Sequence, residues 1–213
     1  MPIRNQSDIA AIEAIPLSER ALPESSYAAL VEASKRSPDG QALSFFLSAD
    51  RLDEAHVWTY AELVADVTRA ANLFAALGVA ADRPVAYVLP NLPDTHFAIW
   101  GGEATGAALA VNPMLEPRQV ADILRFARAS ILVTLAPALN PKGWSGLAEQ
   151  LASLPDLSAI AFVDMADYLE RREARGRARL DRGGRGRLAV KGRQSSRSDA
   201  RAAFRSACPA AND

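Results

Sequence analysis

The chain of 213 residues has little of what marks secreted or membrane-spanning proteins. Its single cysteine, Cys208, has no second cysteine with which to form an internal disulfide. No stretch approaches the roughly 20 consecutive apolar residues that a membrane-spanning helix needs. The N-terminal segment carries Asp8 and Glu13 and lacks the apolar run of a secretory signal. We therefore expect a cytoplasmic protein.

Histidine is also scarce, and its two occurrences form no recognisable site. His56 and His96 lie far apart, with no cysteine and no paired carboxylates beside them. That pattern is typical neither of a zinc site nor of a nucleophile relay, so we interpret both as surface or helix-face residues. Trp58, Trp100 and Trp144 are expected to fill the core rather than to bind a base.

Two glycine-containing segments are candidates for a phosphate-binding loop, and both are poor ones. A phosphate cradle needs several consecutive free amides from small residues, with a lysine adding charge. The Pro-Lys-Gly segment at 141–143 follows residues 136–140, which supply no run of Ser, Thr or Gly. The Gly-Gly-Arg-Gly segment at 183–186 has no strand before it and no Lys-Ser/Thr after it. We expect the first to be an ordinary loop.

The residues from 59 to 78 predict an amphipathic helix with both ends marked. Thr59 and Glu62 have the spacing of a capping box, and such a cap contributes about 1 kcal/mol. Gly78 is expected to end the helix with a positive φ. Apolar residues recur between them at steps of three and four, the spacing of one helix face: Leu63, Val67, Ala70, Phe74 and Leu77.

Short apolar runs alternate with helix-like segments in the middle of the chain, and this indicates an α/β fold. The alternation predicts right-handed βαβ units, hence a parallel sheet flanked by helices. Gly101, Gly102 and Gly106 are expected to permit close backbone packing. The predicted strands are 85–89, 108–111, 131–134 and 159–163, and the predicted helices between them are 94–105, 117–128 and 144–154. Upstream, we expect helices near 8–14 and 26–35, a strand at 42–47, and a polar hairpin-like stretch at 48–55 that leads into 57–58.

The strand ends offer the candidate ligand-binding residues of this fold. In doubly wound sheets, ligands lie beyond the carboxyl ends of the strands. Asn91, Asn112 and Thr134 stand at three of these ends. The two asparagines can present amides to a ligand, but an asparagine beside a proline at a strand end more often caps a turn, which is the interpretation we favour.

The composition changes sharply near residue 170. Residues 1–170 hold 11 Lys and Arg against 21 Asp and Glu, whereas residues 171–213 hold 13 against 4. Ordering this second segment would cost roughly 60 kcal/mol of conformational entropy. Burying its four large apolar side chains returns only about 6–12 kcal/mol. We therefore predict a leader over 1–24, a domain over 25–168 and a disordered Arg-rich tail over 169–213.

The basic tail also raises a nucleic-acid hypothesis. Its excess positive charge favours phosphate, but Phe204 is the only aromatic residue available there for base stacking. The tail shows no recognition-helix pattern either. Nucleic-acid binding is therefore the less favoured alternative.

Seven short segments between about residues 24 and 165 carry a family resemblance through their order and spacing. They are 58–63 (Trp-Thr-Tyr-Ala-Glu-Leu), 76–79 (Ala-Leu-Gly-Val), 82–86 (Asp-Arg-Pro-Val-Ala), 89–91 (Leu-Pro-Asn), 97–106 (a Phe-to-Gly helix), 111–113 (Val-Asn-Pro) and 131–134 (Ile-Leu-Val-Thr). Each is weak alone, but together they resemble the N-terminal subdomain of the AMP-binding acyl-CoA synthetase/ligase family. Segments 90–97 and 100–103 are most similar to its bacterial fatty acyl-CoA synthetases.

This resemblance implies a two-step reaction for the full-length family enzyme. ATP and a carboxylate, with Mg²⁺, give an acyl-adenylate and pyrophosphate, and the thiol of CoA then displaces AMP to form a thioester. The family binds ATP on a Ser/Thr/Gly-rich loop and uses later motifs, together with a lysine of a C-terminal domain, for the chemistry. None of these motifs matches a segment of this chain. No catalytic, cofactor-binding or metal-binding residue is therefore carried over.

We accordingly expect a truncated or frameshifted ligase fragment that is inactive as this chain. A change of reading frame between about 165 and 180 would account for the switch in charge and the loss of apolar periodicity. The alternative is a non-catalytic α/β module that binds an acyl or nucleotide ligand or pairs with a separate C-terminal half. A cut parallel sheet would also have unpaired edges and an uncovered apolar face, which predicts poor solubility.

Overall fold

A computed structural model describes residues 3–139, 141–165, 168 and 189–192 of the chain. Its centre is a five-stranded sheet with the order β4-β3-β5-β6-β7. Four of the strands are parallel: β3 (Val85–Val88), β4 (Ala108–Ala110), β5 (Ile131–Leu135) and β6 (Ala159–Val163). The predicted parallel sheet flanked by helices is confirmed.

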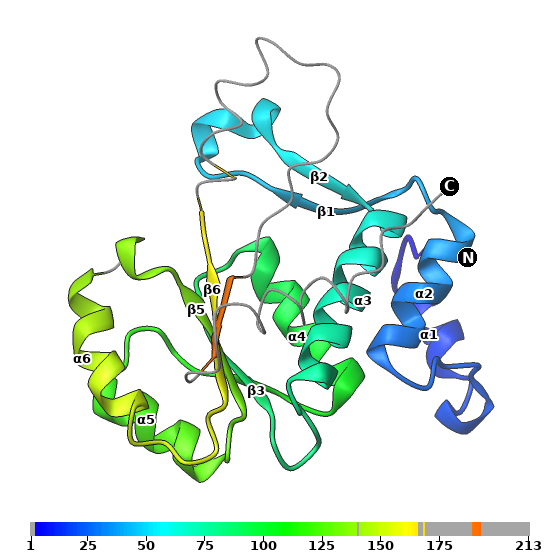
Figure 1. Cartoon of the computed structure of the whole chain (residues 1–213). Coiled ribbons are helices and arrows are strands. Elements are labelled where there is room, and N and C mark those ends of the chain that lie inside the picture. Colours follow the sequence, from blue (N-terminus) through cyan, green and yellow to red (C-terminus); the bar gives the residue numbers. More distant parts are fainter. Residues whose placement is uncertain (1–2, 140, 166–167, 169–188, 193–213) are drawn as a thin grey trace, which may run out of the picture.

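Helices connect these strands and cover both faces of the sheet (Figure 1). They are α3 (Tyr60–Ala76), α4 (Pro93–Thr105), α5 (Pro117–Phe126) and α6 (Pro141–Leu151), with the 3₁₀ turn η3 (Pro137–Leu139) before α6. The expectation of an uncovered apolar face is therefore wrong, because helices pack on both sides of these strands.

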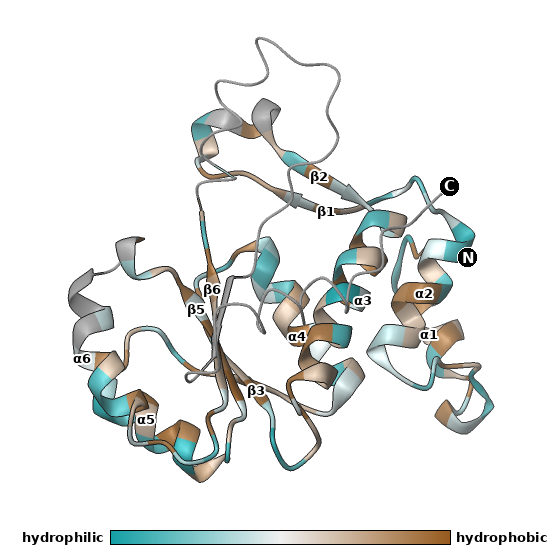
Figure 2. Cartoon of the chain, in the orientation of Figure 1, coloured by the Kyte–Doolittle hydropathy of each residue, from teal (hydrophilic) through white to brown (hydrophobic). Residues whose placement is uncertain are grey.

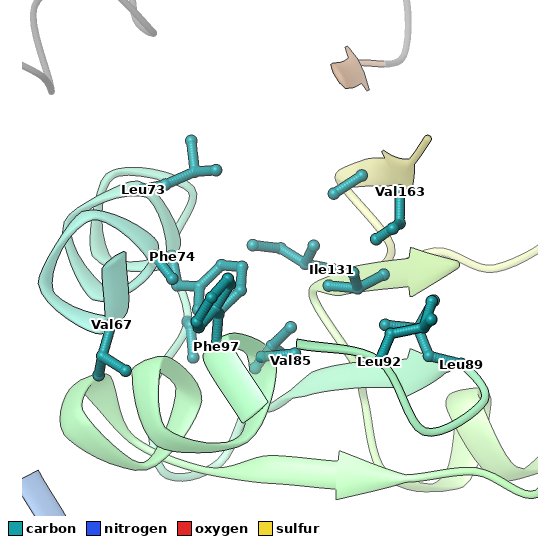
Figure 3. Packing of buried hydrophobic residues seen from close by; sticks show 14 of the residues in the cluster. Val67, Leu73, Phe74, Val85, Leu89, Leu92, Phe97, Ile131 and Val163 are labelled. Atoms are coloured by element: carbon teal, nitrogen blue, oxygen red, sulfur yellow. The ribbon is translucent and has the colours of Figure 1, made fainter. Parts of the chain in front are cut away.

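Alternate residues of each strand divide the core into two clusters, as the period of a strand requires. On what we call the α3–α4 face, Val85, Ile131 and Val163 of the sheet pack against Phe74 and Phe97 of the helices (Figure 3). On the α5–α6 face, Ala86 and Leu132 of the sheet pack against aliphatic side chains. These are Val120, Ala121 and Leu124 of α5, Leu147 and Leu151 of α6, and Leu154 and Leu157 of the loop before β6. Figure 2 shows the hydrophobic colouring along β3 and β5 between these helices. Each large side chain buried in this way contributes about 1.5–3 kcal/mol.

Helix α3 has both of the ends that the sequence predicts. The Thr59 side chain accepts a bond from the Glu62 amide at 3.2 Å, and Glu62 Oε2 accepts from the Thr59 amide at 3.1 Å. Gly78 follows with a φ of 83°. The Val79 amide donates to the Phe74 carbonyl at 3.0 Å, and the Gly78 amide donates to the Ala75 carbonyl at 3.1 Å. These two bonds form a Schellman motif, which satisfies the last carbonyls of the helix.

The N-terminal part of the chain forms two further helices and a hairpin beside this sheet. Helices α1 (Gln6–Glu13) and α2 (Ser26–Arg36) are joined through the 3₁₀ turn η1 (Leu17–Glu19). Strands β1 (Gln41–Phe45) and β2 (His56–Thr59) pair antiparallel as a separate two-stranded sheet, with the turn η2 (Ala49–Glu54) between them. The predicted helices near 8–14 and 26–35 and the predicted strand near 42–47 are thus present, with small shifts at their ends.

Three glycines lie where a side chain would not fit, as predicted. A Cβ on Gly101 would lie 2.9 Å from the Ala70 Cβ of α3. A Cβ on Gly106 would lie 2.3 Å from the carbonyl carbon of Ala80. On Gly102 it would lie 2.5 Å from Val85 Cγ1. These glycines therefore bring α4 close to α3 and to the sheet.

Two expectations from the sequence are corrected. Residues 141–143 are the first turn of α6 rather than a loop, which fits the preference of proline for the first helical position. Within the tail expected to be disordered, β7 (Ala189–Gly192) pairs antiparallel with β6. An edge strand offers unpaired backbone groups to such a segment. The other residues of 169–213 lie outside the described part of the chain, and so does the glycine-rich segment at 183–186.

Candidate functional site

The three polar residues expected at the carboxyl ends of the strands have different surroundings. Asn112 is exposed, and its Oδ1 accepts a bond from the Met114 amide at 2.9 Å. This contact makes it a turn-capping residue, the interpretation favoured from the sequence. Asn91 is exposed in the loop between β3 and α4. Thr134 is buried within β5, opposite Val88 of β3. Asn91 is therefore the ligand-binding candidate that faces solvent at this edge and, within the described residues, is not engaged in a bond like that of Asn112.

The loop that carries Asn91 is held in place by the start of α4. The Thr95 hydroxyl donates to the Pro90 carbonyl at 2.7 Å and accepts from the Leu92 amide at 3.4 Å. Both Thr95 and Asp94 are buried in the first turn of the helix. A carboxylate at this position is favoured by the helix dipole. The loop at the carboxyl end of β3 is thus bonded to the first turn of α4.

A cluster that the sequence did not suggest lies at the same edge. The buried Tyr168 hydroxyl donates to Asp94 Oδ2 at 2.7 Å. Its ring meets the ring of Phe45 edge-on at 5.2 Å, and that of His56 at 5.7 Å. The residues come from the end of the domain, the start of α4 and both strands of the hairpin. Sequence periodicity carries no signal for contacts over such separations.

The three tryptophans and one of the two histidines lie where the sequence predicts them. His96 lies on α4, where its Nδ1 donates to the Leu92 carbonyl at 3.0 Å. His56 is half-buried on β2. Trp58 packs on the α3–α4 face, and its indole Nε1 donates to the buried Asp66 at 3.0 Å. Trp144 packs edge-on against a phenylalanine ring of β6 at 5.0 Å. The three tryptophans pack against the core as expected, Trp100 on the same face as Trp58. His56 instead lies on a strand beside the rings of Trp58 and Tyr168.

One tyrosine of the sheet has a perturbed pKa. Burial raises the pKa of Tyr87, and the nearby carboxylate of Glu103 raises it further. The phenol of Tyr87 is therefore neutral at physiological pH. Burial and Glu103 thus favour the neutral phenol, which gives no sign of an activated nucleophile.

Among residues 3–139, 141–165, 168 and 189–192, no group of three or more His, Cys, Asp or Glu side chains could hold a metal ion. No helix in this described part of the chain is long and apolar enough to cross a membrane.

The chain has an α/β fold with a parallel sheet flanked by helices, and solved structures share this fold. The N-terminal domain of FACL13 from Mycobacterium tuberculosis is similar, with a TM-score of 0.53 and 21% identity. The alignment covers 76% of this chain and 38% of that one. The anthranilate CoA ligase AuaEII, solved with anthranoyl-AMP, gives a TM-score of 0.54 at 21% identity over 68% of this chain and 26% of its own.

Sequence comparison places the chain within a family. The family model described as AMP-binding enzyme matches residues 30–202. The chain therefore belongs to the AMP-binding enzyme family.

Two curated relatives agree with this assignment. The marinolic acid–CoA ligase of Pseudoalteromonas sp. is 36% identical over 139 residues, which cover 65% of this chain and 21% of that protein. The long-chain-fatty-acid–CoA ligase of Bacillus subtilis is 27% identical over 141 residues, which cover 66% of this chain and 23% of that protein. The chain thus spans about a fifth of the length of these relatives.

Proposed function

We propose that this chain supplies the N-terminal scaffold of a cytoplasmic AMP-forming acyl-CoA ligase and that it does not form an acyl-adenylate by itself. The full-length reaction would join a carboxylic acid to CoA at the expense of ATP, giving acyl-CoA, AMP and pyrophosphate. The observation that carries the proposal is the family match over residues 30–202, together with CoA ligases as relatives.

The described residues support the scaffold role. The parallel sheet places its strand ends at one edge, where α/β proteins bind ligands. The loop after β3 is fixed there by Thr95, and it exposes Asn91 to solvent. By contrast, the Pro-Lys-Gly segment at 141–143 begins a helix. It lacks the run of small residues that would cradle a phosphate.

ATP, Mg²⁺ and CoA would be the cosubstrates of the complete enzyme, and a small carboxylic acid its substrate. When bound, Mg²⁺ neutralises phosphate charge during adenylate formation. We assign no residue of this chain to any of them. In this proposal, their binding groups come from the part of a ligase that follows the matched segment, either in the same polypeptide or in a complementary C-terminal half.

The test is ATP–pyrophosphate exchange with the purified 213-residue chain and fatty acids from short to long. We expect exchange at the level of the enzyme-free blank, with the complete Bacillus subtilis ligase as the positive control. Robust exchange by the chain itself would contradict the proposal. Restoration of exchange by a co-expressed C-terminal segment would support the scaffold role.

Calorimetry separates this role from that of an independent binding module. The scaffold proposal predicts no heat of binding for acyl-CoA or ATP with the chain alone. Saturable binding of either ligand at micromolar concentration would favour the non-catalytic module instead.

A further inference from the structure

The β1–β2 hairpin is attached to the domain differently at its two ends. At the end next to α3, the Tyr60 amide donates to the Gly40 carbonyl at 2.9 Å and the Ala61 amide donates to the Pro38 carbonyl at 3.0 Å. The strand β2 also runs directly into α3. This end is therefore fixed by backbone bonds and by chain connection.

The other end of the hairpin has no such backbone anchor among the described residues. There Phe45 stands opposite His56 in the antiparallel register, and the next residues lead away into the turn η2. A two-stranded hairpin is marginally stable by itself in water. The position of this end must therefore come from side-chain contacts.

Tyr168 provides part of those contacts, beside the packing of Phe45 against the core of the α3–α4 face. Its ring meets both members of the last cross-strand pair, Phe45 at 5.2 Å and His56 at 5.7 Å. Its hydroxyl donates to the buried Asp94 Oδ2 at 2.7 Å, and only 7% of the residue is exposed. One side chain thus joins the free end of the hairpin to the first turn of α4.

The geometry points to Tyr168 as a strap that holds the free end of the hairpin against the carboxyl edge of the sheet. Tyr168 lies just beyond β6, and its backbone amide donates to the Met165 carbonyl at 3.0 Å. Tyr168 therefore links the hairpin to the start of α4. This inference rests on contacts within the chain and stands whether or not the ligase proposal holds.

A hydrogen bond into a buried carboxyl group is costly to break. Removing the donor leaves a buried acceptor with one partner fewer, which should raise the opening equilibrium of the hairpin about tenfold. If Tyr168 acts locally, loss of the bond raises the population of the opened hairpin and leaves the population of the opened sheet unchanged.

Hydrogen exchange on the full 213-residue chain tests the strap. In Tyr168→Phe, which keeps the ring but loses the bond, we expect peptides from β1 and β2 to exchange about tenfold faster. Peptides from β3 and β5 should keep their wild-type rates. The matched control is Tyr27→Phe, which loses a 2.8 Å bond between the Tyr27 hydroxyl and Thr68 of α3 and should leave the hairpin unchanged.

Three further variants keep the test decisive. Asp94→Asn retains a side-chain oxygen that can accept the bond. The hairpin amides of Asp94→Asn should therefore exchange more slowly than the hairpin amides of Asp94→Ala. The double variant Tyr168→Phe with Asp94→Ala should exchange no faster than Asp94→Ala alone, because the bond is already absent. Hairpin rates in Tyr168→Phe equal to those in Tyr27→Phe would overturn the inference. So would an equal acceleration of hairpin and sheet.

Discussion

The two faces of the sheet are built by different means. On the α3–α4 face, two helices approach each other and the sheet at glycines, and the buried residues include Asp66, Asp94 and Thr95. On the α5–α6 face, the buried side chains described in the two helices are all aliphatic. The first face also receives contacts from the hairpin and from Tyr168, segments far from it in sequence.

The helices of the two faces contribute differently to the fold: the buried side chains described in α5 and α6 are aliphatic, whereas α3 and α4 also bury polar groups. Aliphatic packing closes a face without specific hydrogen-bond partners and tolerates volume-conserving apolar replacements. Buried polar groups are satisfied only in one geometry, so they fix how distant segments meet. We therefore expect the α3–α4 face to fix how distant segments meet, and the helices of the α5–α6 face mainly to add buried area. Paired substitutions on the two faces test this view.

The largest difference should come from adding one methyl group to a glycine on each face. Gly102→Ala places a Cβ 2.5 Å from Val85 Cγ1 and 3.0 Å from the Ala108 Cβ, and Val85 is fully buried. Overpacking of this kind costs about 1–3 kcal/mol, which exceeds the gain of about 1 kcal/mol in helix propensity. We expect a net loss of up to about 2 kcal/mol in the free energy of unfolding, measured by urea denaturation with circular dichroism.

Gly146→Ala is the matched substitution on α6. Its nearest neighbour would be Pro117 Cγ at 3.3 Å, a contact that a small movement of the ring relieves. The propensity gain should then leave stability unchanged or raise it by up to about 1 kcal/mol. Equal losses for Gly102→Ala and Gly146→Ala would remove the distinction between the faces.

Much of the scaffold could be predicted from the sequence because its signals are local. The helix from Thr59 to Gly78 carries its own cap, apolar stripe and terminator, and all three appear in the structure. The parallel strands follow from the alternation of short apolar runs with helices. The start of α6 at Pro141 was missed because a proline marks a loop as readily as a first helical turn.

The cluster at the carboxyl edge could not be predicted in the same way. The bond from Tyr168 to Asp94 joins residues 74 positions apart, and neither residue has a neighbour that signals the other. An aspartate after a proline indicates a helix start and nothing about its partner. Strand β7 was also missed, because its pairing depends on the exposed edge of β6 and not on its own composition.

The second contrast between the faces concerns one tryptophan on each face, Trp58 and Trp144. Trp58→Phe removes the 3.0 Å bond from Nε1 to Asp66, a buried carboxylate that also pairs with Arg69. Loss of one donor to such a group, with the smaller ring, should cost about 2 kcal/mol. Urea denaturation followed by circular dichroism measures this without depending on tryptophan fluorescence.

Trp144→Phe is the control on the α5–α6 face. There the indole contributes an edge-on ring contact with Phe162 at 5.0 Å, which a phenyl ring can keep. We expect a loss below about 1 kcal/mol, within the range of a conservative apolar replacement. A larger loss for Trp144→Phe than for Trp58→Phe would show that ring volume outweighs the buried hydrogen bond.

The smallest contrast concerns the starts of α3 and α5. Thr59→Ala removes an N-cap whose oxygen accepts from the Glu62 amide at 3.2 Å, which should cost about 1 kcal/mol.

Gln119→Ala is the counterpart on α5. It removes a side chain whose Oε1 accepts from the Glu116 amide at 3.1 Å. Glu116 is exposed, so water can replace this partner, and we expect a cost of about 0.5 kcal/mol or less. The difference between the two variants is near the resolution of urea denaturation, so each midpoint needs replicate measurement. If Gln119→Ala proved as costly as Thr59→Ala, the start of α5 would matter as much as that of α3, and the contrast between the faces would be confined to their buried groups.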